Sequence, residues 1–260
     1  MVQVKEIMTD PVTIDKSERI AHALDIMEKN GIRRMLVTND GKLGGTITMR
    51  QITRVLGTRK SLGMSASSLH VAAATQDAII KILPDMDLDD AIILLQKTAV
   101  LVPVEGDEIL GWVRPRDVLG AVTMEGVASE AMRVPLSIHP QDRLVHARRM
   151  MLDRDVGRLP VVEAGRLVGM LSERDVAKAL KAFRELNETS SRQYSRIDNL
   201  LVQDVMTRDV QTARADTPLE DIRKILLNKN RGGMPVLNQR DELVGMITRT
   251  TLVDYLAQSR

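Results

Sequence analysis

The sequence predicts an α/β (α+β) protein that repeats one βαββα unit four times. The first observation is four short apolar strands that each end in Gly and run into the start of a helix, at 43–52, 109–118, 167–176 and 243–252. The second is an equal spacing, because Met8 and Met132 are 124 positions apart, as are Gly45 and Gly169. Two features displaced by the same amount indicate a duplicated half.

Each copy follows the same internal order. A short β-prone segment comes first, at 11–14, 78–83, 136–138 and 210–212. An amphipathic helix follows; in the first copy Ile20, Ala23, Leu24 and Met27 have helical spacing and Gly31 ends the helix. A second strand, a turn, the Gly-ending strand and a closing helix complete the unit. So small a layer cannot bury both of its faces alone, and we expect neighbouring repeats to pair.

The repeats are predicted at about 1–60, 66–123, 124–183 and 197–260, so that the two halves of the chain are 1–123 and 124–260. Gly111 and Gly245 are 134 positions apart, and the surplus falls in the polar stretch 184–196. That stretch has the composition of a linker between repeats three and four.

Composition excludes several classes of protein. A net charge of +2 gives no strong field toward nucleic acid or anionic lipid, and 2% aromatic residues leave no row of platforms for stacking bases. The sequence has no cysteine, its beginning does not read as a signal peptide, and no apolar run is long enough to span a membrane. We therefore expect a cytoplasmic protein.

Catalytic signatures are absent from the sequence. The four histidines do not have the spacing of metal ligands, and there is no phosphate-binding loop of the Walker type and no activated nucleophile. We expect a protein that is not an enzyme and that holds neither a metal nor a catalytic cofactor.

A hydroxyl and an acid recur where the Gly-ending strand meets its helix. In repeat three these are Ser172 and Asp175. A hydroxyl there can cap the helix, the free N–H groups of the helix start attract a phosphate, and an acid one turn later can accept from both hydroxyls of a ribose. Helix capping alone also explains such residues. Recurrence favours the ligand for Asp175 and leaves Thr48 and Thr248 open between the two interpretations.

The order of these motifs resembles the cystathionine-β-synthase (CBS) domain family. The pattern is Met-Thr, an amphipathic helix, R-x-P-V-V, and then G-φ-φ-[ST]-x-x-D-φ, where φ is apolar. The resemblance is strongest over 157–176 and weakest in repeat two, which lacks the Met-Thr cue. It implies that repeats one and two, and three and four, form two tandem CBS modules with pseudo-two-fold symmetry. It also implies a flat disc similar to the γ subunit of AMP-activated protein kinase.

The resemblance implies a nucleotide in a cleft between paired repeats, with the acid on the ribose and the hydroxyl on a phosphate. Repeat three keeps both residues. Repeat two keeps Asp117 but has Arg114 in place of the hydroxyl, and an arginine there is a candidate phosphate clamp. Repeats one and four have Gln51 and Thr251 in place of the acid, so we expect weak sites or none. One or two sites, centred on Asp175 and Asp117, are predicted to be occupied.

Basic residues before the second strand are further candidates for phosphate contact. We place Arg33 and Arg158 at equivalent positions, where repeats two and four have Leu101 and Gly233. Arg34 and Arg231 are lesser candidates.

The sequence therefore predicts a regulatory protein that senses AMP, ADP or ATP. It would pass its state to a separate effector protein or act through self-association, such as a homodimer. Two alternatives stay open. One is a scaffold or nucleic-acid-binding CBS protein, because the third repeat is rich in arginine. The other is a receptor for S-adenosylmethionine or methylthioadenosine, which would share the adenosine pocket.

Overall fold

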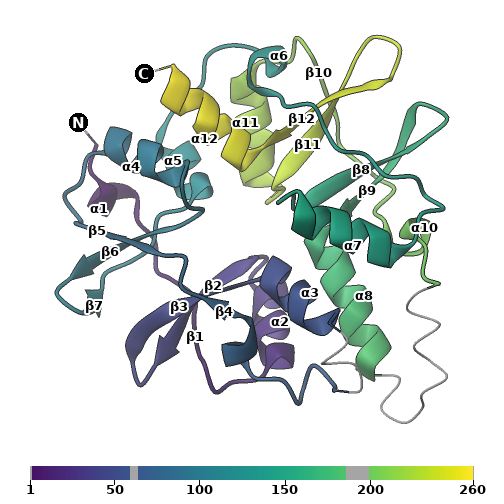
Figure 1. The fold of residues 1–260 in the computed structure, drawn as a ribbon. Helices are drawn as coiled ribbons and strands as arrows, with labels where there is room; N and C mark the ends of the chain where they lie inside the picture. Colours follow the sequence, from purple (N-terminus) through teal and green to yellow (C-terminus); the bar gives the residue numbers. More distant parts are fainter. Residues whose placement is uncertain (1, 59–63, 186–198, 260) are drawn as a thin grey trace. The chain divides into compact units, whose positions relative to one another are not determined.

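The computed structural model describes residues 2–58, 64–185 and 199–259, and these contain the four predicted repeats (Figure 1). The linker predicted at 184–196 lies, from residue 186 on, outside the described residues. Repeat one contains α1 (Val4–Ile7), β1 (Thr13–Asp15), α2 (Ile20–Lys29), β2 (Arg34–Asn39), β3 (Lys42–Thr48) and α3 (Met49–Leu56). Repeat two contains the 3-10 helix η2 (Val71–Ala74), β4 (Thr75–Gln76), β5 (Ile80–Ile82), α4 (Leu88–Leu95), β6 (Leu101–Glu105), β7 (Glu108–Ile109) and α5 (Pro115–Ala121).

The second half repeats this order. Repeat three contains α6 (Ala128–Ala131), α7 (Leu144–Asp153), β8 (Arg158–Glu163), β9 (Arg166–Ser172) and α8 (Glu173–Glu185). Repeat four contains α10 (Val202–Val205), β10 (Ala213–Arg214), α11 (Leu219–Asn228), β11 (Gly233–Leu237), β12 (Leu243–Thr248) and α12 (Arg249–Gln258). None of the helices in the described ranges is long and apolar enough to cross a membrane.

Repeats one, two and four each form a small sheet in which the second strand is central, and repeat three forms the two-stranded sheet β8-β9. The first strand pairs with the central one in parallel and the third in antiparallel, as in β1-β2-β3 and β10-β11-β12. Two predicted first strands were wrong. Residues 136–138 contribute only an isolated bridge from Ile138 to Val161, and residues 210–212 precede the strand β10.

The amphipathic helices bury the predicted faces. In α2 the buried residues are the four predicted from helical spacing, Ile20, Ala23, Leu24 and Met27. Gly31 follows this helix with a φ of 63°, a left-handed conformation that glycine adopts at little cost. This turn delivers the chain into β2, and so fixes where the arginines before that strand lie.

The sequence analysis predicted that the recurring glycines end their strands. They do not. In β3, β9 and β12 the strand continues three residues beyond the glycine to Thr48, Ser172 or Thr248. The glycine instead allows another segment to lie against the strand. A Cβ on Gly169 would lie 2.7 Å from the sulfur of Met206, and one on Gly45 would lie 2.6 Å from the carbonyl oxygen of Gln76.

These covering segments are exchanged between repeats. The residue after each glycine pairs with the start of another repeat, and the pairs are Thr9 with Trp112, Gln76 with Thr46, Arg133 with Met246 and Thr207 with Met170. The beginning of repeat one therefore covers repeat two, and the reverse holds. Repeats three and four exchange in the same way. Thr75–Gln76 takes the place of the Met-Thr cue that repeat two lacks.

The chain forms two compact units, and the start of each repeat lies in the unit that holds the body of its neighbour. Unit 1 comprises Met1–Val12, Ala78–Pro135 and Gln211–Arg260, and unit 2 comprises Thr13–Asp77 and Leu136–Val210. Unit 1 thus holds the bodies of repeats two and four, and unit 2 holds those of repeats one and three. In unit 2 the helix α3 lies beside α8, and in unit 1 the helix α12 lies beside α4 and α5 (Figure 1). The division into modules 1–123 and 124–260 stays a prediction.

Candidate functional site

The four strand-to-helix junctions share one hydrogen bond. In each, the side chain of the residue in the acid position accepts from the backbone N–H of the residue that directly precedes the helix, and so caps the helix. The pairs are Gln51 Oε1 with Thr48 N at 2.6 Å, Asp117 Oδ2 with Arg114 N at 2.9 Å, Asp175 Oδ2 with Ser172 N at 2.8 Å and Thr251 Oγ1 with Thr248 N at 2.9 Å. Capping therefore occurs whether or not the residue is an acid.

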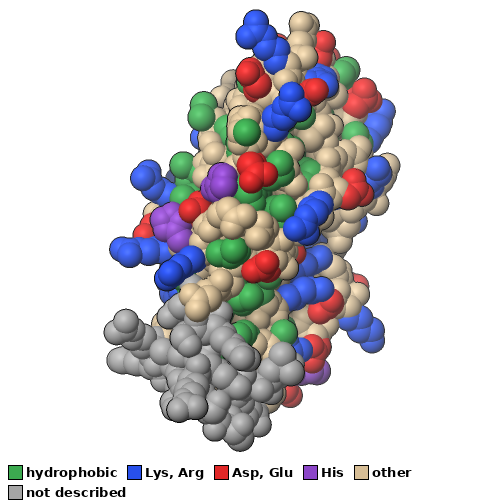
Figure 2. All heavy atoms as spheres, turned by 90° about the vertical axis from the view of Figure 1, so that its right-hand side faces the viewer, with side chains coloured by type: hydrophobic (Ala, Val, Ile, Leu, Met, Phe, Trp, Pro, Cys, Tyr) green, Lys and Arg blue, Asp and Glu red, His purple; other side chains and the backbone are tan. Residues whose placement is uncertain are grey.

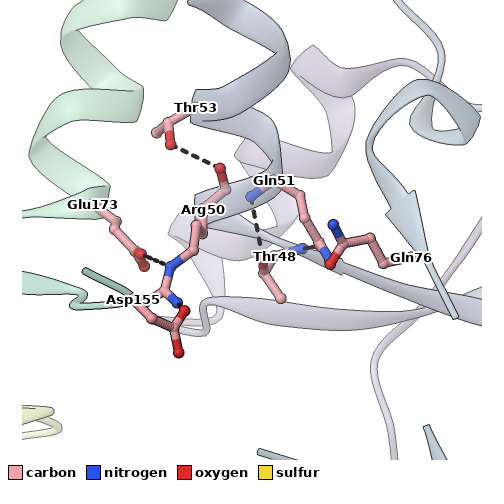
Figure 3. A network of polar contacts seen from close by, with 7 residues as sticks. All are labelled: Thr48, Arg50, Gln51, Thr53, Gln76, Asp155 and Glu173. Atoms are coloured by element: carbon pink, nitrogen blue, oxygen red, sulfur yellow. Dashed lines mark hydrogen bonds and ion pairs between the residues drawn. The ribbon is translucent and has the colours of Figure 1, made fainter. Parts of the chain in front are cut away.

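The junctions differ in what remains after capping. In repeat one, Gln51 donates its amide Nε2 to Gln76 at 2.6 Å (Figure 3). In repeat four, Thr251 has a single oxygen, which already accepts from Thr248. In repeat three, Asp175 uses Oδ2 to accept from the backbone N–H of Ser172 and, at 2.7 Å, from its hydroxyl. Its Oδ1 makes no hydrogen bond or ion pair with the residues that the structure describes. Asp175 therefore keeps an unused acceptor.

The repeat-two junction is closed on itself. The guanidinium of Arg114 donates from Nε to Asp117 Oδ2 at 2.8 Å and from Nη2 to Oδ1 at 2.9 Å. Nη2 also donates to the hydroxyl of Thr9 at 3.1 Å, and the guanidinium carbon lies 4.2 Å from the ring centroid of Trp112. Both carboxylate oxygens of Asp117 are therefore engaged within the protein.

Arg158 lies directly opposite Ser172 in the β8–β9 ladder. Its Nη2 is buried and has no hydrogen-bond partner within the described ranges. A buried cationic donor without a partner is unfavourable. The repeat-three junction thus combines an unused acid oxygen with an unused guanidinium donor.

Strand register corrects one predicted equivalence. Arg34 pairs with Thr48 as Arg158 pairs with Ser172, so Arg34 and not Arg33 corresponds to Arg158. Arg33 corresponds to Gly157, since each carbonyl accepts from the first backbone N–H of the following helix. The prediction counted back from Met35 and Pro160, but Met35 matches Leu159. In repeat two, Leu101 bridges Val113, so the residue that corresponds is Val100. Gly233, opposite Thr248, was assigned correctly.

Arg33 and Arg34 nevertheless both interact electrostatically with acids at the start of α8. Burial lowers the pKa of each guanidinium to about 10. The carboxylate of Glu173 opposes this shift for both residues, and that of Asp175 opposes it for Arg33. Such interactions require charges close in space. Two half-buried arginines from repeat one therefore face the acids of repeat three.

An ion-pair network that the sequence analysis did not predict lies beside these arginines. Figure 3 shows Arg50 of α3 between Glu173 of α8 and Asp155, and it bonds to both. Glu173 is buried, with its side chain 9% exposed. Arg174, the repeat-three counterpart of Arg50, has a buried Nε without a partner among the described residues. The recurrence of arginine at 50, 116 and 174 was the signal that could have revealed this position.

The structure therefore divides the predicted site residues between the two units. Unit 2 holds Ser172, Asp175, Arg158, Arg33, Arg34 and Thr48. Unit 1 holds Arg114, Asp117, Thr248 and Arg231. Repeat three's junction gathers arginines from two repeats, whereas repeat two's junction is tied to Thr9 and Trp112.

Other surfaces do not carry the predicted residues. An open pocket of about 580 Å³ in unit 1 is lined by the starts of α1 and α4, the end of α5 and Arg223. No predicted site residue lines it. Within the described ranges, no group of three or more acids or histidines is placed to hold a metal ion. On the face drawn in Figure 2, basic side chains alternate with acidic ones and do not form a patch of one sign.

Comparisons with known proteins agree with the repeat boundaries. Residues 4–58, 71–123, 128–182 and 202–258 each match the sequence model of the CBS domain. The uncharacterized protein MJ1225 of Methanocaldococcus jannaschii is 28% identical over 266 residues, covering 95% of each chain. The uncharacterized protein MJ1404 of the same organism is 26% identical over 272 residues, covering 98% of this chain and 62% of MJ1404.

A solved structure extends the similarity to three dimensions. The crystal structure of MJ1225, a protein described as a proposed archaeal homologue of γ-AMPK, aligns with a TM-score of 0.84 and 26% identity. The alignment covers 98% of this chain and all of MJ1225. The family matches cover most of the sequence and fall on the four repeats of the structure. The chain therefore belongs to the CBS domain family and contains four CBS domains.

Proposed function

We propose that this protein is a regulatory sensor that binds an adenine nucleotide, AMP, ADP or ATP, at the repeat-three junction. One observation carries the proposal. Asp175 is the acid-position residue whose second polar atom has no hydrogen-bond partner in the described part of the chain, and the neighbouring Arg33 has a pKa lowered by burial. A ligand with a ribose and a phosphate satisfies both.

The ribose end of the ligand is assigned to Asp175. Its Oδ1 is free to accept from the two hydroxyls of a ribose while Oδ2 continues to cap α8. In the absence of ligand the hydroxyl of Ser172 donates to Asp175, so this hydroxyl must rotate before it can donate to a phosphate. The predicted phosphate contact of Ser172 thus depends on a rotamer change of a single side chain.

The phosphate end is assigned to the arginines. The buried Nη2 of Arg158 lacks a partner, and Arg33 and Arg34 have a lowered pKa because they are buried. A phosphate beside them offers strong acceptors and offsets the unfavourable burial of positive charge. The ligand would therefore be expected to stabilise unit 2.

The same arginines weigh against the two alternatives. S-adenosylmethionine or methylthioadenosine has no phosphate to meet them. A nucleic-acid surface needs exposed, unpaired arginines, yet several arginines of repeat three are engaged within the protein. Arg148 donates to the carbonyl of Thr53 at 2.8 Å, and Arg149 pairs with Asp153 at 3.4 Å.

Similarity to MJ1225 supports a regulatory role, since that protein is described as a proposed homologue of γ-AMPK. We propose that the nucleotide changes how CBS modules 1–123 and 124–260 are arranged. A separate effector protein, or a second copy of this chain, then responds to the change. We further propose that the protein acts in the cytoplasm and catalyses no reaction.

The decisive variant is Asp175→Asn. Asn retains a side-chain oxygen that can cap α8, but it places an amide NH₂ where the free Oδ1 was. Loss of a charged acceptor is expected to weaken AMP binding by about 10- to 100-fold. Isothermal titration calorimetry with AMP, 2′-deoxy-AMP and S-adenosylmethionine measures the effect. The wild-type protein should prefer AMP over 2′-deoxy-AMP, and the variant should lose that preference.

Thr251→Ala is the control for any effect of losing a helix cap, because it removes the cap of repeat four, where no unused acceptor is present. It should bind AMP as the wild-type protein does. Equal AMP affinity in the wild type and in Asp175→Asn contradicts the proposal. Preference for S-adenosylmethionine, or binding of RNA that falls steeply with salt, supports the corresponding alternative.

A further inference from the structure

The guanidinium of Arg114 contacts three neighbours, one of which is the acid of its own junction. Its Nε and Nη2 donate to the two oxygens of Asp117, Nη2 also donates to Thr9, and its plane lies over Trp112. The side chain of Asp117 is 5% exposed and that of Arg114 is 22% exposed. A paired guanidinium and carboxylate of this kind form strong, geometrically specific hydrogen bonds.

This arrangement removes what a ribose would need. At the repeat-three junction Oδ1 of Asp175 is unused, whereas at the repeat-two junction Oδ1 of Asp117 accepts from Arg114 at 2.9 Å. A ribose that binds Asp117 must therefore displace a bond already made. The affinity measured at repeat two is therefore the intrinsic affinity multiplied by the fraction of molecules in which that bond is broken.

We propose that Arg114 acts as an internal substitute for a ligand and keeps a second nucleotide site closed at repeat two. Arg114 is thus a residue that determines how many nucleotides the chain binds. This inference rests on the proposed function, because it assigns to repeat two the ligand class assigned to repeat three. It also replaces the expectation that Arg114 clamps a phosphate. Thr9, from the exchanged segment of repeat one, holds the arginine in position.

The test is Arg114→Ser, which installs at repeat two the hydroxyl that repeat three has. Titration of the full chain with AMP should show one site in the wild-type protein and two in the variant. The double variant Arg114→Ser with Asp175→Asn should bind one AMP, through repeat two. We expect affinity at repeat two to rise at least about tenfold over the wild-type protein.

Arg116→Ser is the matched control, because Arg116 is the neighbouring exposed arginine and bonds Asn230 instead of Asp117. It should leave the number of sites at one. Circular dichroism and thermal melting establish that each variant is folded. A folded Arg114→Ser chain that binds no additional AMP overturns the inference. The inference is also overturned if the single change Asp117→Asn weakens AMP binding relative to the wild-type protein.

A measurement without ligand separates this inference from the proposed function. In wild-type protein labelled with ¹⁵N at arginine, the Nε–H of Arg114 should exchange slowly with water, and in Asp117→Asn it should exchange as fast as that of Arg116. Fast exchange in the wild type overturns the closed junction even if AMP binds at repeat three. Slow exchange combined with no AMP binding by any variant overturns the proposed function and, with it, the idea of a closed nucleotide site.

Discussion

The two units join their repeats with different chemistry. In unit 1, α12 of repeat four packs on α4 and α5 of repeat two through buried apolar residues, among them Leu119, Leu252, Val253 and Leu256. In unit 2, the contact between α3 of repeat one and α8 of repeat three is crossed by the ion pair of Arg50 and Glu173. Further pairs between these repeats join Lys178 to Glu28 and Lys181 to Asp25.

This difference indicates which of the two contacts between repeats depends on salt and on bound anions. Apolar packing changes little with salt or with ligands, whereas a contact with unpaired arginines responds to any anion that binds there. Unit 2 contains the half-buried Arg33 and Arg34, while unit 1 has Val100 and Gly233 at the position that corresponds to Arg34. We therefore expect unit 1 to be stable without a nucleotide and unit 2 to gain stability from one.

The largest expected effect is that of Leu252→Ala in unit 1. Leu252 is fully buried, so removal of its side chain leaves a cavity and should cost about 3 kcal/mol of unfolding free energy. Urea denaturation at low and high NaCl measures the loss, which should not depend on salt. Leu83→Ala is the control, since Leu83 is 65% exposed. A strong salt dependence would contradict the apolar description of unit 1.

The next effect is that of Glu173→Gln in unit 2. This change removes the carboxylate that faces Arg33, Arg34 and Arg50, and should cost about 2 kcal/mol because positive charges remain without a partner. Added sulfate or AMP should recover part of the loss in thermal melting, and the exposed Glu163→Gln should behave as the wild type. If AMP gives equal stabilisation in the wild type and in Leu252→Ala but a larger one in Glu173→Gln, the difference between the units is sharpened.

The smallest effect concerns one of the ion pairs of unit 1. Arg223 pairs with Glu220 at 2.6 Å and donates to the carbonyl of Leu119 at 2.7 Å. The hydrogen bond from Arg223 lowers the pKa of Glu220 to about 2. Because the carboxyl is more acidic in the folded chain, its contribution is present above its ordinary pKa, near 4.5, and is lost as pH falls toward 2.

Glu220→Gln should therefore cost about 1 kcal/mol at pH 7 and less at pH 3, which lies between the ordinary pKa of the carboxyl and its pKa in the folded chain. Urea denaturation at pH 7 and pH 3 gives the comparison, with the exposed Glu108→Gln as control. A cost that is equal at both pH values would show that packing, and not the charge of Glu220, produces the effect.

The sequence was sufficient for the repeats because periodicity and spacing are local properties. The buried face of α2 and the positions of Ser172 and Asp175 at a strand end followed from them directly. Whether a junction has an unused hydrogen-bond acceptor did not follow from the sequence, because this depends on the partner of the second carboxylate oxygen. Side-chain geometry decides that Arg114 binds Asp117, and that Asp175 Oδ1 has no hydrogen-bond partner among the described residues. The sequence analysis matched Arg33 to Arg158 wrongly, because it counted residues back from Pro160 and ignored which residues pair across the sheet.

The exchanged segments also have a consequence for how a chain of four repeats evolves by duplication. A repeat cut out at its own sequence boundaries would leave its glycine-containing strand uncovered and carry a segment that covers nothing, as Gly169 and Met206 illustrate. The smallest portion that can be copied with every glycine-containing strand covered is therefore two consecutive repeats. The 124-residue interval between Met8 and Met132 has the length of such a portion. Gene duplication by pairs, and not by single repeats, is the step that the interlocking of neighbours favours for this chain.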